Sequence, residues 1–483
     1  MKQVRKKSAD AAVNQMIMKA YRSQTELTWD RAEAMQPLCG FGRLSICCGD
    51  CYDGPCRVNP FAQAEQRTIC GRDQTALAAG YFLRKVTDGA AGLVQLAAEF
   101  GASVSQDMWE AVVSPGDDML ASADGGERLA AAGRAAVQAL AAIAEVKERM
   151  CGQAAPGVTG AGLGTLKAEM PNIVLHGHIA PQVVELLVQA AERSGTVNIV
   201  AMCGNELSGP RYLPALTNYQ SQETPLLTGA VDLLVVGAQC VMPAAVSLAK
   251  RLNVPVVKAR DVRDDQAAAQ LVAMAQEAFR CRNGRKTYIP AASAAVQAGY
   301  TAKSSAAVAA NLVKGYGQGI VRGAIYLGGC GQLAATQDAA IVRLAQDLLA
   351  DGYLLVTAGC AGVALAKAGL CRPDAAEGEA LRQVLPPGVP AVLTVGSCHD
   401  AGEFLRLAGV LQASGLPVTA VMPEVTHGKV LATAVGFAGQ GIVTFLGLGE
   451  AMEVSGLHGE ERLLPLADLR QLPQALAEVA AAK

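Results

Sequence analysis

The stretch Val231-Asp-Leu-Leu-Val-Val-Gly-Ala-Gln-Cys240 decides the fold expected for this sequence. It is a short aliphatic run that ends in glycine and then in a possible ligand, a pattern that predicts the carboxyl end of a buried parallel strand. Similar runs alternate with helical segments along the chain, which is typical of parallel α/β units. The expected strands are 172–175, 197–202, 231–236, 254–258, 324–327, 353–357, 391–395, 418–422 and 442–446.

The chain before residue 172 has a different character. Residues 11–34, 74–100 and 126–150 are long, rich in Ala and Leu, and without strand-like runs, so they predict helices. We therefore expect an α/β fold with an all-helical N-terminal domain and two Rossmann-like parallel-sheet domains. The expected domains are 1–168, which includes the N-terminal cysteine motifs, 169–317 and 318–483.

Composition narrows the classes of function. The 483 residues carry a formal net charge of −2, with a pI near 6.3, so no surface for nucleic acid is indicated. No apolar run of about 18 uncharged residues occurs, and no apolar segment follows the basic N-terminus. We therefore expect no membrane span and a cytoplasmic protein. The 14 cysteines should then be reduced, and metal ligation is a better explanation for them than disulfides.

Six of the cysteines lie between residues 39 and 70. Four of them, Cys48, Cys51, Cys56 and Cys70, have the spacing of a loop that wraps a [4Fe–4S] cluster and a later fourth ligand. A structural zinc site is the alternative. Cys39 and Cys47 remain, and two thiolates from each of two chains could hold an iron–sulfur cluster across a homodimer interface. The alternative for this pair is two free thiols.

A second group of possible ligands is scattered in the sequence but shares one position. Each member lies at or just after the end of an expected strand, where open α/β sheets bind their ligands. One cysteine at such a place is usually a small buried apolar residue, but five cysteines and a histidine indicate a shared metal cluster. They are His178, Cys203, Cys240, Cys330, Cys360 and Cys398.

Other motifs carry no function here. Cys151, Cys281 and Cys371 lack the strand-end placement, so we expect them to be structural. Two glycine-rich segments, 160–164 and 315–319, lack the strand-then-helix context of a dinucleotide site. Electrons should therefore pass through clusters and a protein partner rather than a nicotinamide.

With these motifs the chain resembles the catalytic subunit of anaerobic nickel–iron carbon monoxide dehydrogenases, over nearly its whole length. The resemblance implies that Cys39 and Cys47 bridge a dimer and that the next four cysteines form an electron relay. It also implies that the strand-end residues hold the active-site cluster, and that a ferredoxin-like protein accepts electrons. The segment Met422-Pro-Glu-Val-Thr-His-Gly-Lys429 resembles the one that carries the family's active-site lysine. Lys429 is thus a candidate for stabilising an anion or donating a proton, and His427 and His399 are candidates for proton transfer.

Two departures from the family pattern bear on the chemistry. After the second strand of the middle domain the sequence is Met202-Cys203-Gly-Asn-Glu206. If the Gly-Asn-Glu segment is aligned with that of the family, the ligand position falls on Met202. If the strands are aligned instead, Cys203 lies one residue before the ligand position, and one residue along a strand reverses the side-chain direction. Glu206 is a possible oxygen ligand instead. The family's spaced histidines are also missing from residues 86–96, which removes a general acid/base.

These departures lead to an expectation about activity. The related hybrid-cluster proteins reduce hydroxylamine at an iron–sulfur–oxygen cluster that includes a carboxylate ligand. We expect an oxidoreductase with a modified cluster, Fe–S–O or Ni–Fe–S, that reduces a small nitrogen oxide. Oxidation of CO to CO₂, with two electrons passed to the ferredoxin-like acceptor, is the first alternative. A non-catalytic protein for electron storage or redox sensing is the second.

Overall fold

The computed structural model describes residues 6–113, 125–151, 155–209, 211–282, 286–448, 462–466 and 468–481. The chain forms two compact units. Unit 1 comprises residues 1–32, 99–102 and 140–418, and unit 2 comprises residues 33–98, 103–139 and 419–483.

A four-stranded parallel sheet forms one half of unit 1. Its strand order is β5-β4-β6-β7, with bounds Asn198–Met202, Asn172–His176, Leu233–Val236 and Val256–Lys258. The register pairs Val174 with both Val200 and Leu234. Because successive residues of a strand face opposite sides, these three side chains lie together in one apolar cluster, and their sequence neighbours lie in another.

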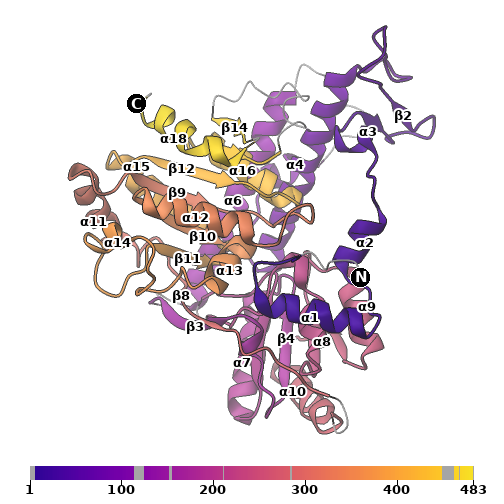
Figure 1. Ribbon diagram of the computed structural model, residues 1–483, viewed down its shortest axis with the longest axis vertical. Helices are drawn as coiled ribbons and strands as arrows, with labels where there is room; N and C mark the ends of the chain where they lie inside the picture. The colour runs from indigo at the N-terminus through magenta and orange to yellow at the C-terminus, as the bar shows by residue number, and fades with distance from the viewer. Residues whose placement is uncertain are drawn as a thin grey trace. The chain divides into compact units, whose positions relative to one another are not determined.

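Helices cover both faces of this sheet, which explains why its strands are apolar throughout. On one face lie α7 (Pro181–Ser194) and α10 (Asp265–Arg280), which contact each other. The other face receives α1 (Ala11–Arg22), α8 (Thr224–Leu227) and α9 (Pro243–Arg251). Figure 1 shows the indigo α1 beside α8, so the N-terminal segment packs on the middle of the chain.

A second sheet of unit 1 has the strand order β9-β10-β11-β8-β3. The bounds are Gly323–Leu327, Tyr353–Ala358, Val392–Gly396, Ala294–Ala298 and Gly157–Ala161. The first four strands are parallel, and β3 runs antiparallel to β8 at the edge. The accompanying helices are α11 (Ala306–Gly317), α12 (Ala339–Ala350), α13 (Gly359–Lys367), α14 (Glu379–Arg382) and α15 (Ala401–Ala413).

Unit 2 is built around long helices that approach each other at glycines. A Cβ atom added to Gly89 of α4 (Gln74–Glu99) would lie 2.0 Å from the carbonyl oxygen of Gly428, the first residue of α16 (Gly428–Gly439). The helix α6 (Gly125–Cys151), whose last part from Leu140 belongs to unit 1, meets α16 in the same way at Gly133. Side chains are therefore excluded where these helices cross.

The remaining elements of unit 2 are short. Its C-terminal strands have the order β14-β13-β12 and are parallel. Two small strands, β1 and β2, form an antiparallel pair within the N-terminal cysteine segment. The bounds are β1 Cys47–Cys48, β2 Cys56–Arg57, β12 Val418–Met422, β13 Val443–Leu446, β14 Leu463–Pro465, α2 Thr28–Ala34 (shared with unit 1), α3 Gly40–Arg43, α5 Gln106–Glu110 and α18 Leu472–Ala481.

The predicted combination of helices and parallel sheets is confirmed, with differences in detail. The segment 11–34 forms two helices, α1 and α2, because the chain turns between them and Gln24 adopts a φ of +52°. β3 is a strand in a region expected to be helical, and it pairs with β8, which was also not predicted. The three-domain division stays a prediction.

Among the described helices, only α6 is long and apolar enough to cross a membrane by length and composition. In the structure 61% of its apolar window is buried inside the protein, as in the core helix of a globular fold. The absence of a membrane span stays a prediction.

Candidate metal centre

Six strands of unit 1 each end next to one of the predicted strand-end ligands. From the four-stranded sheet, β4, β5 and β6 lead to His178, Cys203 and Cys240. From the second sheet, β9, β10 and β11 lead to Cys330, Cys360 and Cys398. Each sheet therefore contributes three donors from neighbouring parallel strands, at the edge where such sheets bind ligands.

The donors of the two sheets meet at His178. Its Nε2 atom lies 3.7 Å from the sulfur of Cys240 and 3.6 Å from the sulfur of Cys398. Burial raises the pKa of the Cys203 thiol, and the thiol of Cys360 is close enough to contribute to that rise. Cys330 acts electrostatically on Tyr219 together with Cys203, Cys240 and Cys360. The structure thus brings all six predicted donors into one site.

Tight backbone turns allow this convergence. Gly359 has a φ of +61°, and a Cβ atom there would lie 2.8 Å from Cβ of Cys398. Only glycine permits such a close approach between the loops that follow β10 and β11. Cys240 itself adopts a φ of +54°, which is uncommon for a residue with a side chain and marks a constrained functional loop.

The loop after β5 carries the residues among which the sequence leaves the ligand position open. Met202 is fully buried in the apolar cluster on one face of the sheet. Cys203 adopts a φ of +56°, and this turn directs its side chain to Cys360. Cys203, and not the buried Met202, therefore lies beside another of the predicted donors.

Glu206 lies in the same loop and is hydrogen bonded to its backbone. Its Oε2 atom accepts hydrogen bonds from the backbone N–H groups of Gly204 and Asn205, the latter at 2.9 Å. Burial raises the pKa of this carboxyl group to about 7. The carboxylate therefore supports the backbone next to Cys203 and lies near that thiol.

The electrostatics of the site favour a protonated Cys203 thiol when no metal is bound. Burial raises the pKa of Cys203, and the neighbouring Cys360, Glu206 and Cys240 add to the shift. Burial likewise raises the pKa of Tyr219, which lies beside the same thiols. Since metals bind thiolates, loading this site must release protons.

His399 lies directly behind the donor set. Its Nδ1 atom is 2.9 Å from Nδ1 of His178 and 2.8 Å from Oγ of Ser397. Its Nε2 atom is 2.8 Å from Nζ of Lys147, a residue of α6. His399 is therefore in contact with one candidate ligand, and its proton role stays a prediction.

Lys147, Ser208 and Asp400 are polar residues of the site that the sequence did not reveal. Lys147 Nζ donates to Ser208 Oγ at 2.5 Å and forms an ion pair with Asp400. Ser208 in turn donates to Asp400 at 2.8 Å. No motif marks them, because Lys147 occurs in an ordinary charged helix end, Glu145-Val-Lys-Glu-Arg149.

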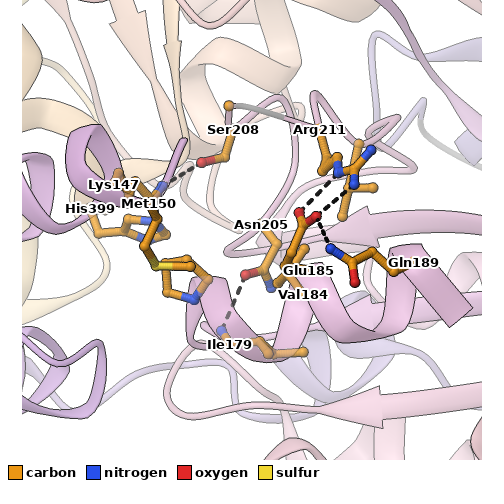
Figure 2. Close-up of a pocket in the computed structure, with 13 residues that line it drawn as sticks. Lys147, Met150, Ile179, Val184, Glu185, Gln189, Asn205, Ser208, Arg211 and His399 are labelled. Atoms are coloured by element: carbon orange, nitrogen blue, oxygen red, sulfur yellow. Dashed lines mark hydrogen bonds and ion pairs between the residues drawn. The ribbon is translucent and has the colours of Figure 1, made fainter. Parts of the chain in front are cut away.

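A pocket of about 430 Å³ is lined in part by Lys147, Ser208 and His399 of this network. Figure 2 shows Lys147, His399 and Ser208 together in its wall, and Arg211 paired with Glu185 across from them. Ile179, Val184 and Leu213 supply apolar lining. The pocket thus ends at the residues that back His178.

The N-terminal cysteine segment lies in unit 2. Cys48 and Cys56 are cross-strand partners in the β1–β2 pair. Cys51 lies in the turn between them, and Cys51 and Cys70 are exposed. The register brings two of the four predicted relay ligands together, and the turn carries a third close by.

Polar contacts support the same segment. Arg72 lies 3.8 Å from the sulfur of Cys48 and forms an ion pair of 2.9 Å with Asp50. Burial acts to raise the pKa of Asp50, but hydrogen bonds from Arg84 and Arg72 outweigh it and lower the pKa to about 2. A hydrogen bond with Thr68 lowers the pKa of Cys70. This favours the thiolate that iron requires.

The other predicted residues have separate positions. Cys39 is exposed and precedes α3, and Cys47 is partly buried in β1. His427 is the N-cap residue of α16 and Lys429 lies in its first turn, both in unit 2. Burial, with a contribution from Lys429, lowers the pKa of His427 to about 4.

The cysteines expected to be structural are placed as follows. Cys371 is buried and Cys281 is exposed, where its thiol contacts Glu277. The side chain of Cys151 lies outside the described residues.

The donor set of the strand-end site fits a polynuclear iron–sulfur centre. Five thiols and an imidazole are soft or borderline ligands. Within the described residues, no group of three His, Cys, Asp or Glu side chains is placed to hold a single ion. Gln220, beside Gly331, is 2% exposed, and neither polar atom of its amide has a hydrogen-bond partner among the described residues. A bound group would supply that partner.

Comparison with known proteins agrees with this assignment. Residues 104–456 match the Prismane/CO dehydrogenase family. Carbon monoxide dehydrogenase 1 of Carboxydothermus hydrogenoformans is 28% identical, over 92% of this chain and 91% of that protein. The carbon monoxide dehydrogenase of Rhodospirillum rubrum is 26% identical, over 88% of each. The solved structure of carbon monoxide dehydrogenase IV from Carboxydothermus hydrogenoformans has a TM-score of 0.85 and 26% identity, over 99% of both chains.

The fold and the thiol-rich site together define an iron–sulfur oxidoreductase. Because the family match covers most of its length, the chain belongs to the Prismane/CO dehydrogenase family.

Proposed function

We propose that this protein reduces a small nitrogen oxide such as hydroxylamine at an altered active-site cluster, and that it oxidises CO poorly. The observation that carries the proposal is the α4 stretch 86–96, which contains no histidine and is largely buried, including Val86, Ala90 and Leu93. The buried Glu206 beside Cys203 adds a carboxylate to the thiol set, as in hybrid-cluster proteins.

The proposal assigns three clusters. His178, Cys203, Cys240, Cys330, Cys360 and Cys398 would hold the active-site cluster, with Glu206 as a possible oxygen ligand. Cys48, Cys51, Cys56 and Cys70 would hold a [4Fe–4S] relay, and Cys39 and Cys47 would share a further Fe–S cluster with a second chain. When bound, the active-site cluster supplies electrons and an open metal position for the substrate.

Hydroxylamine suits this site chemically. Its reduction breaks the N–O bond with two electrons and two protons, and yields ammonia and water. CO oxidation instead needs a water molecule activated for attack on carbon, so it depends more strongly on a positioned base. A protein without the helical histidines is therefore better matched to the reduction.

Four further residues would position His178, bind an anionic group or transfer a proton. Lys147 and His399 hold the imidazole of His178 from behind. The pocket that ends at Lys147 and His399 offers small molecules an approach to this network. Lys429 and His427, at the start of α16, would bind an anionic group or transfer a proton.

CO oxidation is the second candidate, and the names of the relatives favour it. In the family that the chain resembles, the position of Cys398 is that of the expected nickel thiolate, so a Ni–Fe–S cluster is compatible with the donor set. A non-catalytic electron-storage or redox-sensing protein is the third candidate, and it would hold its clusters without turnover of either substrate.

We also propose a cytoplasmic homodimer that exchanges electrons with a ferredoxin-like protein. The segment that contains Cys39 and Cys47 has an apolar surface. Met35 is 68% exposed, Leu38 52% and Ile69 72%. An apolar surface beside Cys39 supports burial against a second chain.

The test is one anaerobic preparation assayed for both reactions, with nickel measured against iron. We expect slow hydroxylamine reduction with a low-potential dye as the electron donor, and CO oxidation far below that of the family's CO dehydrogenases even after nickel loading. Rapid CO turnover without hydroxylamine turnover would establish the second candidate instead. Clusters without either activity would establish the third.

A further inference from the structure

The inference concerns the side chain of Lys147 and the loops that it joins. Its ammonium group has three N–H donors, and three acceptors surround it: Ser208 Oγ at 2.5 Å, His399 Nε2 at 2.8 Å and the carboxylate of Asp400. The side chain is only 14% exposed. All its hydrogen-bonding capacity is therefore used, and its position is fixed.

The partners of Lys147 belong to two different ligand loops. Ser208 lies on the loop after β5, which carries Cys203 and Glu206. His399 and Asp400 lie on the turn after β11, which begins with Cys398. Asp400 also accepts a hydrogen bond from the backbone N–H of Ser397 at 2.9 Å. Lys147 thus ties a ligand loop of one sheet to a ligand loop of the other.

The same contacts set the orientation of the ring behind His178. An ammonium group only donates hydrogen bonds, so Nε2 of His399 must accept from Lys147. Nδ1 of His399 then faces Ser397 and His178. Groups behind a metal-binding histidine normally fix its ring orientation and tune the bound metal.

We infer that Lys147 is a positioning residue for the active-site cluster, holding Cys203, Cys398 and His178 in one arrangement. This inference rests on the proposed cluster at the strand-end site. It differs from a role in catalysis because the hydrogen bonds that Lys147 makes among the described residues go to Ser208, His399 and Asp400, through which it acts.

The experiment compares anaerobically purified parent protein with Lys147→Met, and with Lys250→Met as the matched control. Lys250 is an exposed residue in the last turn of α9 of the same unit. The readouts are the electron paramagnetic resonance spectrum of each cluster and the rate of iron loss to a chelator. We expect Lys147→Met to change the active-site signal and to lose that iron about tenfold faster, with the relay signal unchanged.

A second variant separates positioning from general destabilisation. Lys147→Met alone leaves the Asp400 carboxylate buried without its cation, whereas Lys147→Met/Asp400→Asn removes both charges. The double variant should fold and still show the altered signal. Parent-like spectra and chelator rates in Lys147→Met overturn the inference, and so does failure of both variants to fold. A parent protein with no cluster beyond those of residues 39–70 overturns the proposed function itself.

Discussion

The side chains of Cys203 and Cys360 lie beside each other although they follow strands of two different sheets. Cys203 reaches this position because its backbone turns into the left-handed region directly after β5. A one-residue change of register within a regular strand moves a side chain to the opposite face, and here the left-handed turn after β5 lets Cys203 lie beside Cys360.

Removal of the Cys203 sulfur should disturb the active-site cluster. We expect Cys203→Ala to lower the iron content and to change the cluster spectrum. Cys371→Ala, at a cysteine that is also buried but outside the donor set, should leave both unchanged. Iron content and spectra that are identical in Cys203→Ala and the parent protein would contradict the role of Cys203.

The relay prediction concerns Cys51, which is exposed in the turn between β1 and β2. Cys51→Ser should lose the relay cluster and slow electron delivery sharply, since a neutral hydroxyl is a poor iron ligand. Cys281→Ser, at another exposed cysteine, is the control. Rapid-mixing spectroscopy with reduced dye measures the rate, and an unchanged rate would remove the assignment.

Cys39 and Cys47, the two N-terminal cysteines outside the relay set, should contribute to the association of two chains. Cys39→Ala combined with Cys47→Ala should remove one cluster per dimer and weaken association, while the active-site clusters remain. Iron analysis together with analytical ultracentrifugation under anaerobic conditions tests this. An iron stoichiometry equal to that of the parent protein would argue against a bridging cluster.

Lys367 should stabilise unit 1 through a buried ion-pair network. Nζ lies 2.6 Å from Asp338 and 3.2 Å from Asp10, the N-cap residue of α1. Burial acts to lower the pKa of Lys367, but Asp338 and Asp10 outweigh it and raise the pKa. The contribution to stability is therefore complete below about pH 10.4 and is lost as the pH rises through the folded-state value.

The measurement is urea unfolding of the parent protein, Lys367→Met and Lys250→Met from neutral to alkaline pH. We expect Lys367→Met to lose about 3–5 kcal/mol near pH 7, because two buried carboxylates are left without their cation. The difference from the parent should narrow above the ordinary lysine pKa. Equal stability of Lys367→Met and Lys250→Met at pH 7 would contradict the prediction.

His427 should make the free energy of unfolding depend on pH in the acidic range. Its folded-state pKa of about 4 lies below the ordinary value of 6.5. The unfolded chain therefore binds more protons between these two values, and stability rises with pH across that window. His427→Gln should flatten this part of the stability–pH curve by at most about 3 kcal/mol. A slope that is unchanged in the variant would show that His427 is not its source.

The sequence predicted the parallel strands and their ends well, because buried strands of this kind are short apolar runs that stop at glycine. The predicted strand 418–422 coincides with β12, for example. β3 and β8 escaped prediction because Gly157-Val-Thr-Gly-Ala161 and Ala294-Ala-Val-Gln-Ala298 are dominated by small residues. Their strand conformation comes from pairing with each other, which local sequence does not encode.

Some residues of the candidate site could likewise be predicted from the sequence, and others could not. Rare residue types at repeated positions, such as Cys240 and Cys398, were recognisable without coordinates. Lys147 was not, because its role depends on Ser208 and Asp400, which are distant in sequence. Sequence could also show that Cys203 was one residue out of register, but not that a left-handed φ would restore its direction.

The contact between Gly89 and Gly428 has a consequence for the substitutions that α4 can accept. A histidine introduced at position 89 would meet the backbone of α16 at once, and most neighbouring α4 positions, such as Val86, Ala90 and Leu93, are filled core positions. A histidine at one of these buried positions would require α16 or the surrounding core to move before the imidazole could be accommodated. Single substitutions that introduce a histidine at these positions would therefore lose stability first, and the packing of two glycines restricts which side chains this helix crossing can accept.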